Sequence, residues 1–201
     1  LIQKGTTELG GTNVHQRLAE AYSVGGAFEE ALTHYEKALQ DHLEINTLFG
    51  YAVTAYQAGF YEKAIEKFIS VKELDPEYHS VYLLLARSYE HEEKLQESLE
   101  TIQEGVKQDE YNKELNLFGG KISLKLGLEK EAETFFREAL ALDPGYVEAA
   151  LVINKLFFTQ DRFEDVLEIA QMLKVEGEEE LQINWDLAKA YEGLEKFNHA
   201  L

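Results

Sequence analysis

Four cationic residues recur at a fixed interval in a chain that is otherwise strongly acidic. Arg87, Lys121, Lys155 and Lys189 follow one another at equal spacing, although the chain has only 19 Lys and Arg against 38 Asp and Glu. Cationic side chains pair with carboxylates, and an ordered array of them selects a partner of complementary charge. These four residues, which we call the cationic ladder, therefore predict a surface that binds acidic side chains.

The residue types that could perform catalysis do not form a set with credible spacing. The chain has six histidines, but none forms a His-Glu-x-x-His pair: His91-Glu92-Glu93-Lys94 is followed by Leu95, so the second metal ligand is missing. Without a convergent acid, base, nucleophile or metal group, we predict that the chain is not an enzyme and needs no metal or cofactor.

Two short motifs resemble ligand loops but are better explained by helices and turns. In Gly119-Gly120-Lys121, Leu115 replaces the first glycine of a phosphate loop and Ile122 replaces its hydroxyl residue, so a tight helix crossing is predicted instead. The segment Glu176–Glu180 lacks the alternating Asp and Asn ligands of a calcium loop, and a solvated turn is predicted there.

Composition narrows the class of partner. The net charge of −19 disfavours nucleic acid and anionic membrane surfaces. No stretch is long and apolar enough to span a bilayer, and the absence of cysteine fits a reducing compartment. We therefore expect a cytoplasmic protein whose partner is another protein.

A repeat of roughly 34 residues organises the whole chain. Pro76 and Pro144 lie two repeat lengths apart in similar tetrapeptides, Glu73–Pro76 and Ala141–Pro144. Units that start at Thr12, Ile45, His79, Lys113, Val147 and Leu181 align with this spacing. The predicted domain organisation is a preceding hairpin end or linker at 1–11, then units 12–44, 45–78, 79–112, 113–146, 147–180 and a partial unit 181–201.

Each unit has the pattern of two amphipathic helices joined by a turn. Small residues recur at the eighth and twentieth places, as in Ala19 and Ala31, where two helices must cross closely. Large apolar residues fill the seventh and twenty-fourth places, as in Tyr51 and Phe68. Glycine stands at the fifteenth place in three units, where a left-handed turn favours it, and proline then ends the second helix of two units.

This pattern resembles the tetratricopeptide repeat (TPR) family, and the short, regular, cysteine-free repeats resemble its bacterial multi-repeat members. The segments Leu18–Tyr22 and Ala132–Leu140 carry the resemblance, which covers about residues 12 to 201. It implies an all-α, right-handed superhelical solenoid of antiparallel helix-turn-helix hairpins. Departures at Ser98, Gly105, Gly119, Asn154, Val166 and Leu173 predict looser packing or altered crossing angles in units three to five.

The resemblance also implies a peptide-binding groove lined by the first helix of each hairpin. Its contacts fall mainly at the second, fifth, ninth, twelfth and thirteenth places of a unit. The residues predicted to line this groove are Phe49, Val53, Tyr56, Leu83, Arg87, Leu117, Lys121, Leu124, Leu151, Lys155, Phe158, Trp185 and Lys189. A groove that is both cationic and apolar predicts a partner segment with acidic and aliphatic or aromatic side chains.

Other interpretations of these residues stay open at this stage. The cationic ladder could pair with acidic neighbours such as Glu114, Glu148 and Glu192, and the apolar residues could pack between adjacent helices. The chain could also be the regulatory or substrate-docking region of a larger enzyme or sensor, or an element that drives homo-oligomerisation.

One known binding mode of the family is disfavoured by the residues present. Members that clamp a C-terminal carboxylate need Lys and Asn at fixed places of three successive units. The first three units present Gln16, Glu20, Gly50, Ser80 and Leu84 there, and the next register fails as well. We therefore do not expect this chain to bind the tails of the chaperones Hsp70 or Hsp90 by that mechanism.

The two ends suggest a piece of a longer repeat array. The sixth unit is expected to stop at Leu201, just inside its second helix, which would leave an apolar face without a capping helix. Leu1–Gly5 is expected to be the last turn of an earlier hairpin.

Overall fold

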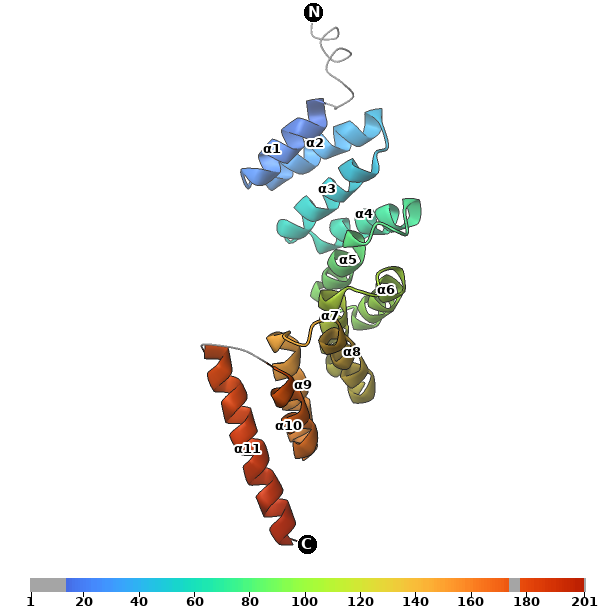
Figure 1. The fold of residues 1–201 in the computed structure, drawn as a ribbon. Helices are drawn as coiled ribbons and strands as arrows, with labels where there is room; N and C mark the ends of the chain where they lie inside the picture. The colour runs from blue at the N-terminus through green and yellow to red at the C-terminus, as the bar shows by residue number, and fades with distance from the viewer. Residues whose placement is uncertain (1–13, 174–177, 201) are drawn as a thin grey trace, which may run out of the picture. The chain divides into compact units, whose positions relative to one another are not determined.

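The repeat predicted from the sequence corresponds to a series of helices along the chain (Figure 1). The computed structural model describes residues 14–173 and 178–200. The predictions for 1–11, for Leu1–Gly5 and for Glu176 and Gly177 therefore lie outside the described residues. The helices are α1 (Val14–Val24), α2 (Phe28–Asp41), α3 (Ile45–Gln57), α4 (Tyr61–Leu74), α5 (Ser80–His91), α6 (Leu95–Gln108), α7 (Lys113–Lys125), α8 (Glu129–Leu142), α9 (Val147–Thr159), α10 (Phe163–Met172) and α11 (Glu178–Ala200).

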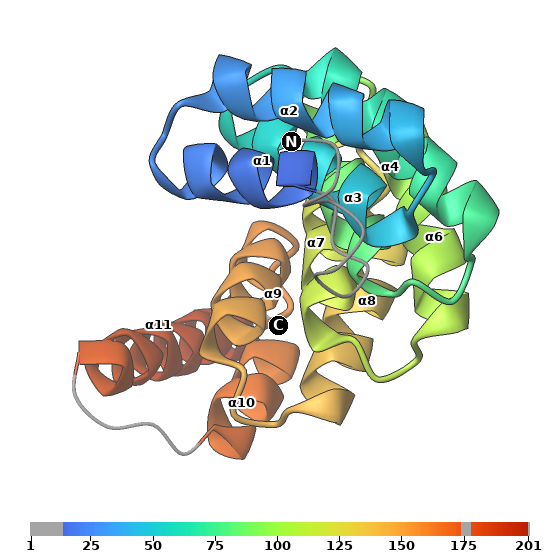
Figure 2. The ribbon, with the colours of Figure 1, turned by 90° about the horizontal axis from the view of Figure 1, so that it is seen from above.

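These helices belong to two compact units, Leu1–Gln108 and Asp109–Leu201. The first unit contains α1 to α6 and the second contains α7 to α11. Within the described part of each unit, consecutive helices up to α10 pack as antiparallel hairpins (Figure 2). The predicted all-α fold of helical hairpins is confirmed.

The turn inside each hairpin has the same backbone conformation. Gly26, Gly59 and Gly127, each at the fifteenth place of its repeat, adopt positive φ angles of 77°, 79° and 75°. The third and fifth repeats have no glycine there but keep this conformation, with φ of 57° at Glu93 and 55° at Asp161. The left-handed turn is thus dictated by the packing of the two helices, and glycine is only the residue that adopts it most easily.

In the compact unit Leu1–Gln108, the small residues at the helix crossings are buried as predicted. Ala19, Ala52 and Ala86 on the first helices of the hairpins are 0% exposed, and so are Ala31 and Ala64 on the second helices. At the remaining crossing of this unit, the hydroxyl of Ser98 donates a hydrogen bond of 2.8 Å to the carbonyl oxygen of Ala86. The serine is therefore accommodated by a polar contact between α5 and α6 rather than by loose packing.

In the compact unit Asp109–Leu201, Gly120 of α7 lies directly against Phe136 of α8. A Cβ atom at this position would lie 2.3 Å from Cε1 of Phe136, whose side chain is fully buried. Gly119 and Gly120 are both buried within α7. The helix crossing predicted for this segment is confirmed, and the phosphate-loop interpretation is excluded because a phosphate loop needs a free turn before its helix.

A network of ion pairs joins α8 to the start of α10. Arg162 donates two hydrogen bonds to the carboxylate of Glu133, of 2.6 and 3.0 Å, and Arg137 contacts Asp165 at 3.0 Å. The hydrogen bonds from Arg162 lower the pKa of Glu133 to about 2. Because the guanidinium of Arg162 also lies 4.3 Å from the ring centroid of Phe157, this network orients the hairpin α9–α10 against α8.

The two prolines follow the second helices of their hairpins as predicted. Helix α4 ends at Leu74 and α8 at Leu142, shortly before Pro76 and Pro144. The next first helix is tied back to this bend in the first unit, since the hydroxyl of Tyr82 donates a 2.7 Å hydrogen bond to the carbonyl oxygen of Pro76. The bends thus set where α5 and α9 begin.

The sixth repeat differs from the prediction. The sixth repeat was predicted to reach its second helix before Leu201, but α11 runs without interruption from Glu178 to Ala200. Glu178–Glu180 belongs to this helix rather than to the predicted turn. The predicted crossing residue Ala188 is exposed, whereas Ile183 and Ala190 are buried. Helix α11 packs on α10 and α9 with its third and tenth places buried, as Val81 and Ser88 are at the same places of α5, but no second helix among the described residues covers its eighth place.

Candidate functional site

The predicted groove residues differ widely in how much of each side chain solvent can reach. Phe49, Leu83 and Leu151 are partly buried, and Trp185 is 59% exposed. Leu117 is only 5% exposed and belongs to the hydrophobic core of the second unit with Phe136. Leu117 therefore packs between helices, as the alternative interpretation held, and is not offered to a partner.

The four residues of the cationic ladder also differ in their surroundings. Lys121 forms an ion pair of 2.5 Å with Glu148, which is one of the acidic neighbours considered from the sequence. Arg87, Lys155 and Lys189 are exposed. The ammonium of Lys189 lies 5.1 Å from the ring centroid of Trp185, one turn earlier on α11. The ion-pair explanation thus holds for Lys121, while the ammonium groups of Lys155 and Lys189 remain open to solvent.

A pocket in the unit Asp109–Leu201 brings five of the predicted groove residues together. Its volume is about 560 Å³, and it lies between α9 and α11. Figures 1 and 2 both show α11 beside α9 and α10. The lining residues are Leu151, Lys155, Phe158, Thr159, Gln182, Trp185, Asp186 and Lys189, and we call this the α9–α11 pocket.

This pocket combines apolar walls with charges of both signs. Phe158 and Trp185 supply aromatic surface, and Lys155 and Lys189 supply two exposed ammonium groups. Asp186, by contrast, is only 8% exposed. Its Oδ1 accepts a 3.0 Å hydrogen bond from Gln182, and its Oδ2 accepts one of 3.4 Å from Asn154.

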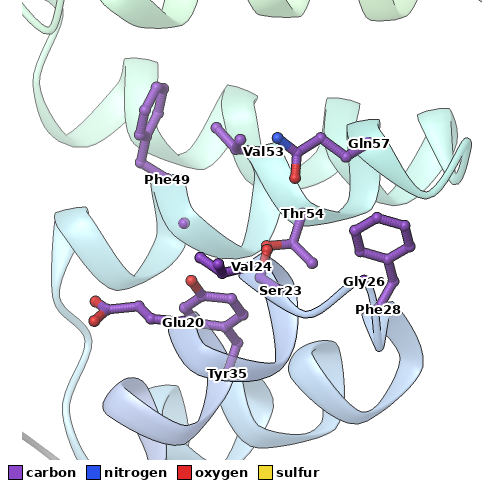
Figure 3. Close-up of a pocket in the computed structure, with 11 residues that line it drawn as sticks. Glu20, Ser23, Val24, Gly26, Phe28, Tyr35, Phe49, Val53, Thr54 and Gln57 are labelled. Atoms are coloured by element: carbon purple, nitrogen blue, oxygen red, sulfur yellow. The ribbon is translucent and has the colours of Figure 1, made fainter.

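A second pocket, of about 640 Å³, lies between α1, α2 and α3 in the other unit (Figure 3). Phe49 and Val53 line it from α3, and Glu20 lines it from α1. Its polar contact is the hydrogen bond of 2.9 Å between the hydroxyls of Ser23 and Thr54. This pocket is acidic rather than cationic at the ninth place, because Glu20 and Val53 stand where repeats four to six carry Lys.

Tyr35 and Gly50 shape this pocket together. A Cβ atom at Gly50 would lie 2.8 Å from the hydroxyl oxygen of Tyr35, so the absence of a side chain there lets the tyrosine reach α3. Burial raises the pKa of the Tyr35 hydroxyl. The pocket can thus offer hydroxyl groups and an apolar wall, but the described residues give it no positive charge.

The remaining predicted residues lie outside both pockets. Tyr56 packs edge-on against Tyr61 and His91, whose rings stack with a centroid distance of 4.1 Å. Leu83 and Arg87 lie on α5, and Leu124 is partly buried on α7. Among the described residues, no group of three or more His, Cys, Asp or Glu side chains is arranged to hold a metal ion.

Sequence reasoning did not select the polar floor of the α9–α11 pocket. Asp186 stands at the sixth place of its unit, where the three preceding units carry Leu84, Phe118 and Val152. An acidic residue at a place that is otherwise apolar was the available signal. It was missed because the resemblance directs attention only to places that contact ligands in related repeats.

Taken together, the paired helices, the repeated crossing residues and the turns of one conformation define a protein built from helical-hairpin repeats. Comparison with known proteins specifies the class further. The tetratricopeptide repeat pattern matches residues 51–113 and again residues 117–146. The chain is 45% identical over 194 residues to the TPR repeat-containing protein YpiA of Bacillus subtilis (strain 168), an alignment that covers 96% of this chain and 46% of YpiA.

Solved structures agree on the fold. The crystal structure of MamA superposes with a TM-score of 0.71 at 16% identity and covers 94% of this chain and 98% of its own. A thermophilic TPR protein of Thermus thermophilus superposes with a TM-score of 0.55 at 21% identity, over 88% of this chain and 97% of its own. The chain belongs to the tetratricopeptide repeat family and is of the bacterial type that its sequence predicted.

The chain spans about half the length of the curated relative that it matches, with 46% of that protein aligned. Within the part of the chain that the structure describes, none of the helices has the length and apolar character needed to cross a membrane. The fold supports a role in protein–protein interaction in general, and the binding site and partner are argued below.

Proposed function

We infer that this chain is a non-catalytic, cytoplasmic scaffold that binds a protein segment with acidic and aromatic or aliphatic side chains in its α9–α11 pocket. The observation that carries this proposal is the convergence of Leu151, Lys155, Phe158, Trp185 and Lys189 on one pocket. The fifth and ninth places of two successive units thus contribute to one surface.

Charge favours an acidic partner at this place. Lys155 forms no ion pair with another described residue, and Lys189 contacts the face of Trp185 rather than a carboxylate. A chain with a net charge of −19 therefore keeps two ammonium groups beside a pocket without neutralising them. Carboxylates of a bound segment can pair with both ammonium groups without first breaking an ion pair within the described residues.

The apolar walls supply the rest of the binding free energy. Exposed ion pairs contribute only about 0 to 1 kcal/mol each, so two of them give modest affinity. Burial of an aromatic or aliphatic side chain contributes roughly 25 cal/mol for each Å² removed from water. A segment that places an apolar side chain between two acidic ones therefore matches the pocket in both charge and shape.

A peptide-binding measurement tests this proposal. Short fluorescent peptides with a central aromatic residue flanked by glutamates are titrated with the purified chain, beside matched peptides in which lysine replaces each glutamate. We expect the acidic peptides to bind and the basic ones to bind much more weakly. The double variant Lys155→Glu/Lys189→Glu should weaken binding of the acidic peptides by roughly tenfold or more, because two attractions become repulsions.

Lys130→Glu is the matched control for this charge reversal. Lys130 is an exposed residue of α8 that lines neither of the pockets described above. Its reversal changes the net charge in the same direction as one ladder substitution but should leave peptide affinity unchanged. Equal affinity of the native chain and the double variant for the acidic peptides would refute the proposal.

A further inference from the structure

The α9–α11 pocket has a buried acidic residue beneath its cationic rim, and this residue points to a specific anchor in the bound segment. This inference rests on the proposed function. Asp186 lines the pocket and is 8% exposed, whereas Lys155 and Lys189 on the same pocket are exposed. A buried carboxylate is costly unless hydrogen bonds or a cation compensate its charge.

The described residues compensate the negative charge of the Asp186 carboxylate only in part. Its two hydrogen bonds come from the neutral amides of Gln182 and Asn154, and the second is long, at 3.4 Å. The described part of the chain provides no cationic partner for it. Since each carboxylate oxygen can accept two hydrogen bonds, Asp186 has acceptor capacity left for a ligand.

Asn154 shows that this region has more acceptors than donors. This side chain is fully buried on α9, and its Oδ1 atom has no hydrogen-bond partner among the described residues. Turning the amide over would place Oδ1 against the Asp186 carboxylate, where two acceptors would repel each other. The amide therefore cannot satisfy its own oxygen and Asp186 together, so a group that contacts Asp186 from the pocket must donate a hydrogen bond to it.

Three kinds of donor can be compared. A lysine or arginine side chain would have to pass Lys155 and Lys189, whose ammonium groups repel it. A serine or asparagine would leave the aromatic walls formed by Phe158 and Trp185 poorly filled. A tyrosine or tryptophan fills those walls with its ring and carries one O–H or N–H donor on the edge of that ring.

From this combination we propose that the α9–α11 pocket anchors a tyrosine or tryptophan of the partner, with the ring between Phe158 and Trp185 and its O–H or N–H donated to Asp186. Acidic residues on either side of this anchor pair with Lys155 and Lys189. The recognised segment is therefore acidic–aromatic–acidic, and the aromatic residue must carry a hydrogen-bond donor.

Tyrosine and phenylalanine peptides that differ only by the hydroxyl group test the anchor on the native chain. A hydrogen bond to a charged group, or its loss in a buried site, corresponds to roughly tenfold or more in affinity. We expect the Glu-Tyr-Glu peptide to bind at least that much more tightly than the Glu-Phe-Glu peptide. Equal affinities, or a preference for a central lysine, would overturn the anchor.

Asp186→Ala shows whether this preference depends on the buried carboxylate. In this variant the ratio of the two affinities should fall to near one. Asn184→Ala is the matched control, because Asn184 is an exposed residue of the same helix and does not line the pocket. A tyrosine preference that persists in Asp186→Ala contradicts the proposal even if the variant is as stable as the native chain.

The same titrations separate this inference from the proposed function. If both peptides bind equally and both are lost in Lys155→Glu/Lys189→Glu, the acidic-segment scaffold stands and the donor anchor is wrong. If no peptide binds at all, both are wrong. Since the tyrosine and phenylalanine comparison uses the unaltered chain, a loss of folding in Asp186→Ala cannot hide the answer.

Discussion

Gly120 shows how a single hydrogen atom in place of a side chain controls the packing of two helices. Its α-carbon faces the buried ring of Phe136, and an added methyl group would lie 2.3 Å from the ring carbon Cε1. Gly120→Ala should therefore lower the free energy of unfolding by about 1–3 kcal/mol, as for other overpacked core positions. Chemical denaturation followed by circular dichroism measures this change.

Gly145→Ala serves as the control for that substitution. The nearest atom to a Cβ at Gly145 is Oδ1 of Asp143, at an ordinary distance of 3.4 Å. Alanine there should be neutral or slightly stabilising, because it reduces the freedom of the unfolded chain. If Gly120→Ala were as harmless as Gly145→Ala, the close approach of α7 and α8 described above would be wrong.

At the scale of single residues, the sequence predicts a place in the repeat but not the surroundings of the side chain at that place. Of the residues predicted at the fifth and ninth places, Leu151, Lys155, Trp185 and Lys189 line the α9–α11 pocket. The burial of Leu117 was not predictable, because an apolar residue at one place of a repeat can serve a groove or a core. Asp186 was missed for the opposite reason, since its role depends on Asn154 in another helix.

At the scale of elements, the turn within a hairpin imposes its conformation on whichever residue occupies it. Glu93 joins α5 to α6 with φ of 57°, although a side chain with a Cβ is strained there by roughly 1 kcal/mol. Glu93→Gly should therefore raise the free energy of unfolding by about 1 kcal/mol or slightly less, because glycine also gains freedom in the unfolded chain.

Glu92, the residue before Glu93, is a control of the same residue type. Glu92 has φ of −88°, a value that suits any residue with a side chain. Glu92→Gly should lower stability by several tenths of a kcal/mol to about 1 kcal/mol, since it adds only freedom to the unfolded state. Thermal unfolding of both variants checks the opposite signs, and two changes of the same sign would contradict the strain at Glu93.

The last helix shows where a repeat pattern stops predicting elements. The repeat frame predicted that the sixth repeat reaches its second helix before Leu201, but α11 continues without interruption through Glu195. In the earlier hairpins the turn is held because a second helix packs back onto the first. Glutamate favours a helix in the absence of such packing, so the frame alone cannot decide between a turn and a continued helix. The same change explains why Ala188 is exposed, since the second helix of each earlier hairpin covers the eighth place of the first.

At the scale of the molecule, the fold was predictable because independent signals agreed. Period, crossing residues, turn glycines and prolines all fixed the same frame, and the helices from α1 to α10 follow it. The binding site was less predictable, because a groove depends on which side chains meet across helices, and a repeat pattern specifies only their places along each helix.

The high net charge of the chain lowers its stability through overall self-repulsion, which does not depend on any single ion pair. A charge of −19 on 201 residues makes the folded chain repel itself, and the Debye length of about 10 Å at 0.1 M salt sets how far this repulsion acts. The chain should therefore become more stable between about 20 mM and about 300 mM NaCl at pH 7, because added ions screen that repulsion. Thermal unfolding followed by circular dichroism measures the change.

The same measurement near pH 4.7, where the net charge vanishes, separates self-repulsion from other effects of salt. Screening then has little net repulsion to remove, so the increase in melting temperature with NaCl should largely disappear. An equal increase at both pH values would show that salt acts through burial of apolar surface instead. A decrease at pH 7 would mean that ion pairs such as those of Arg162 with Glu133 outweigh the repulsion of the excess acidic residues.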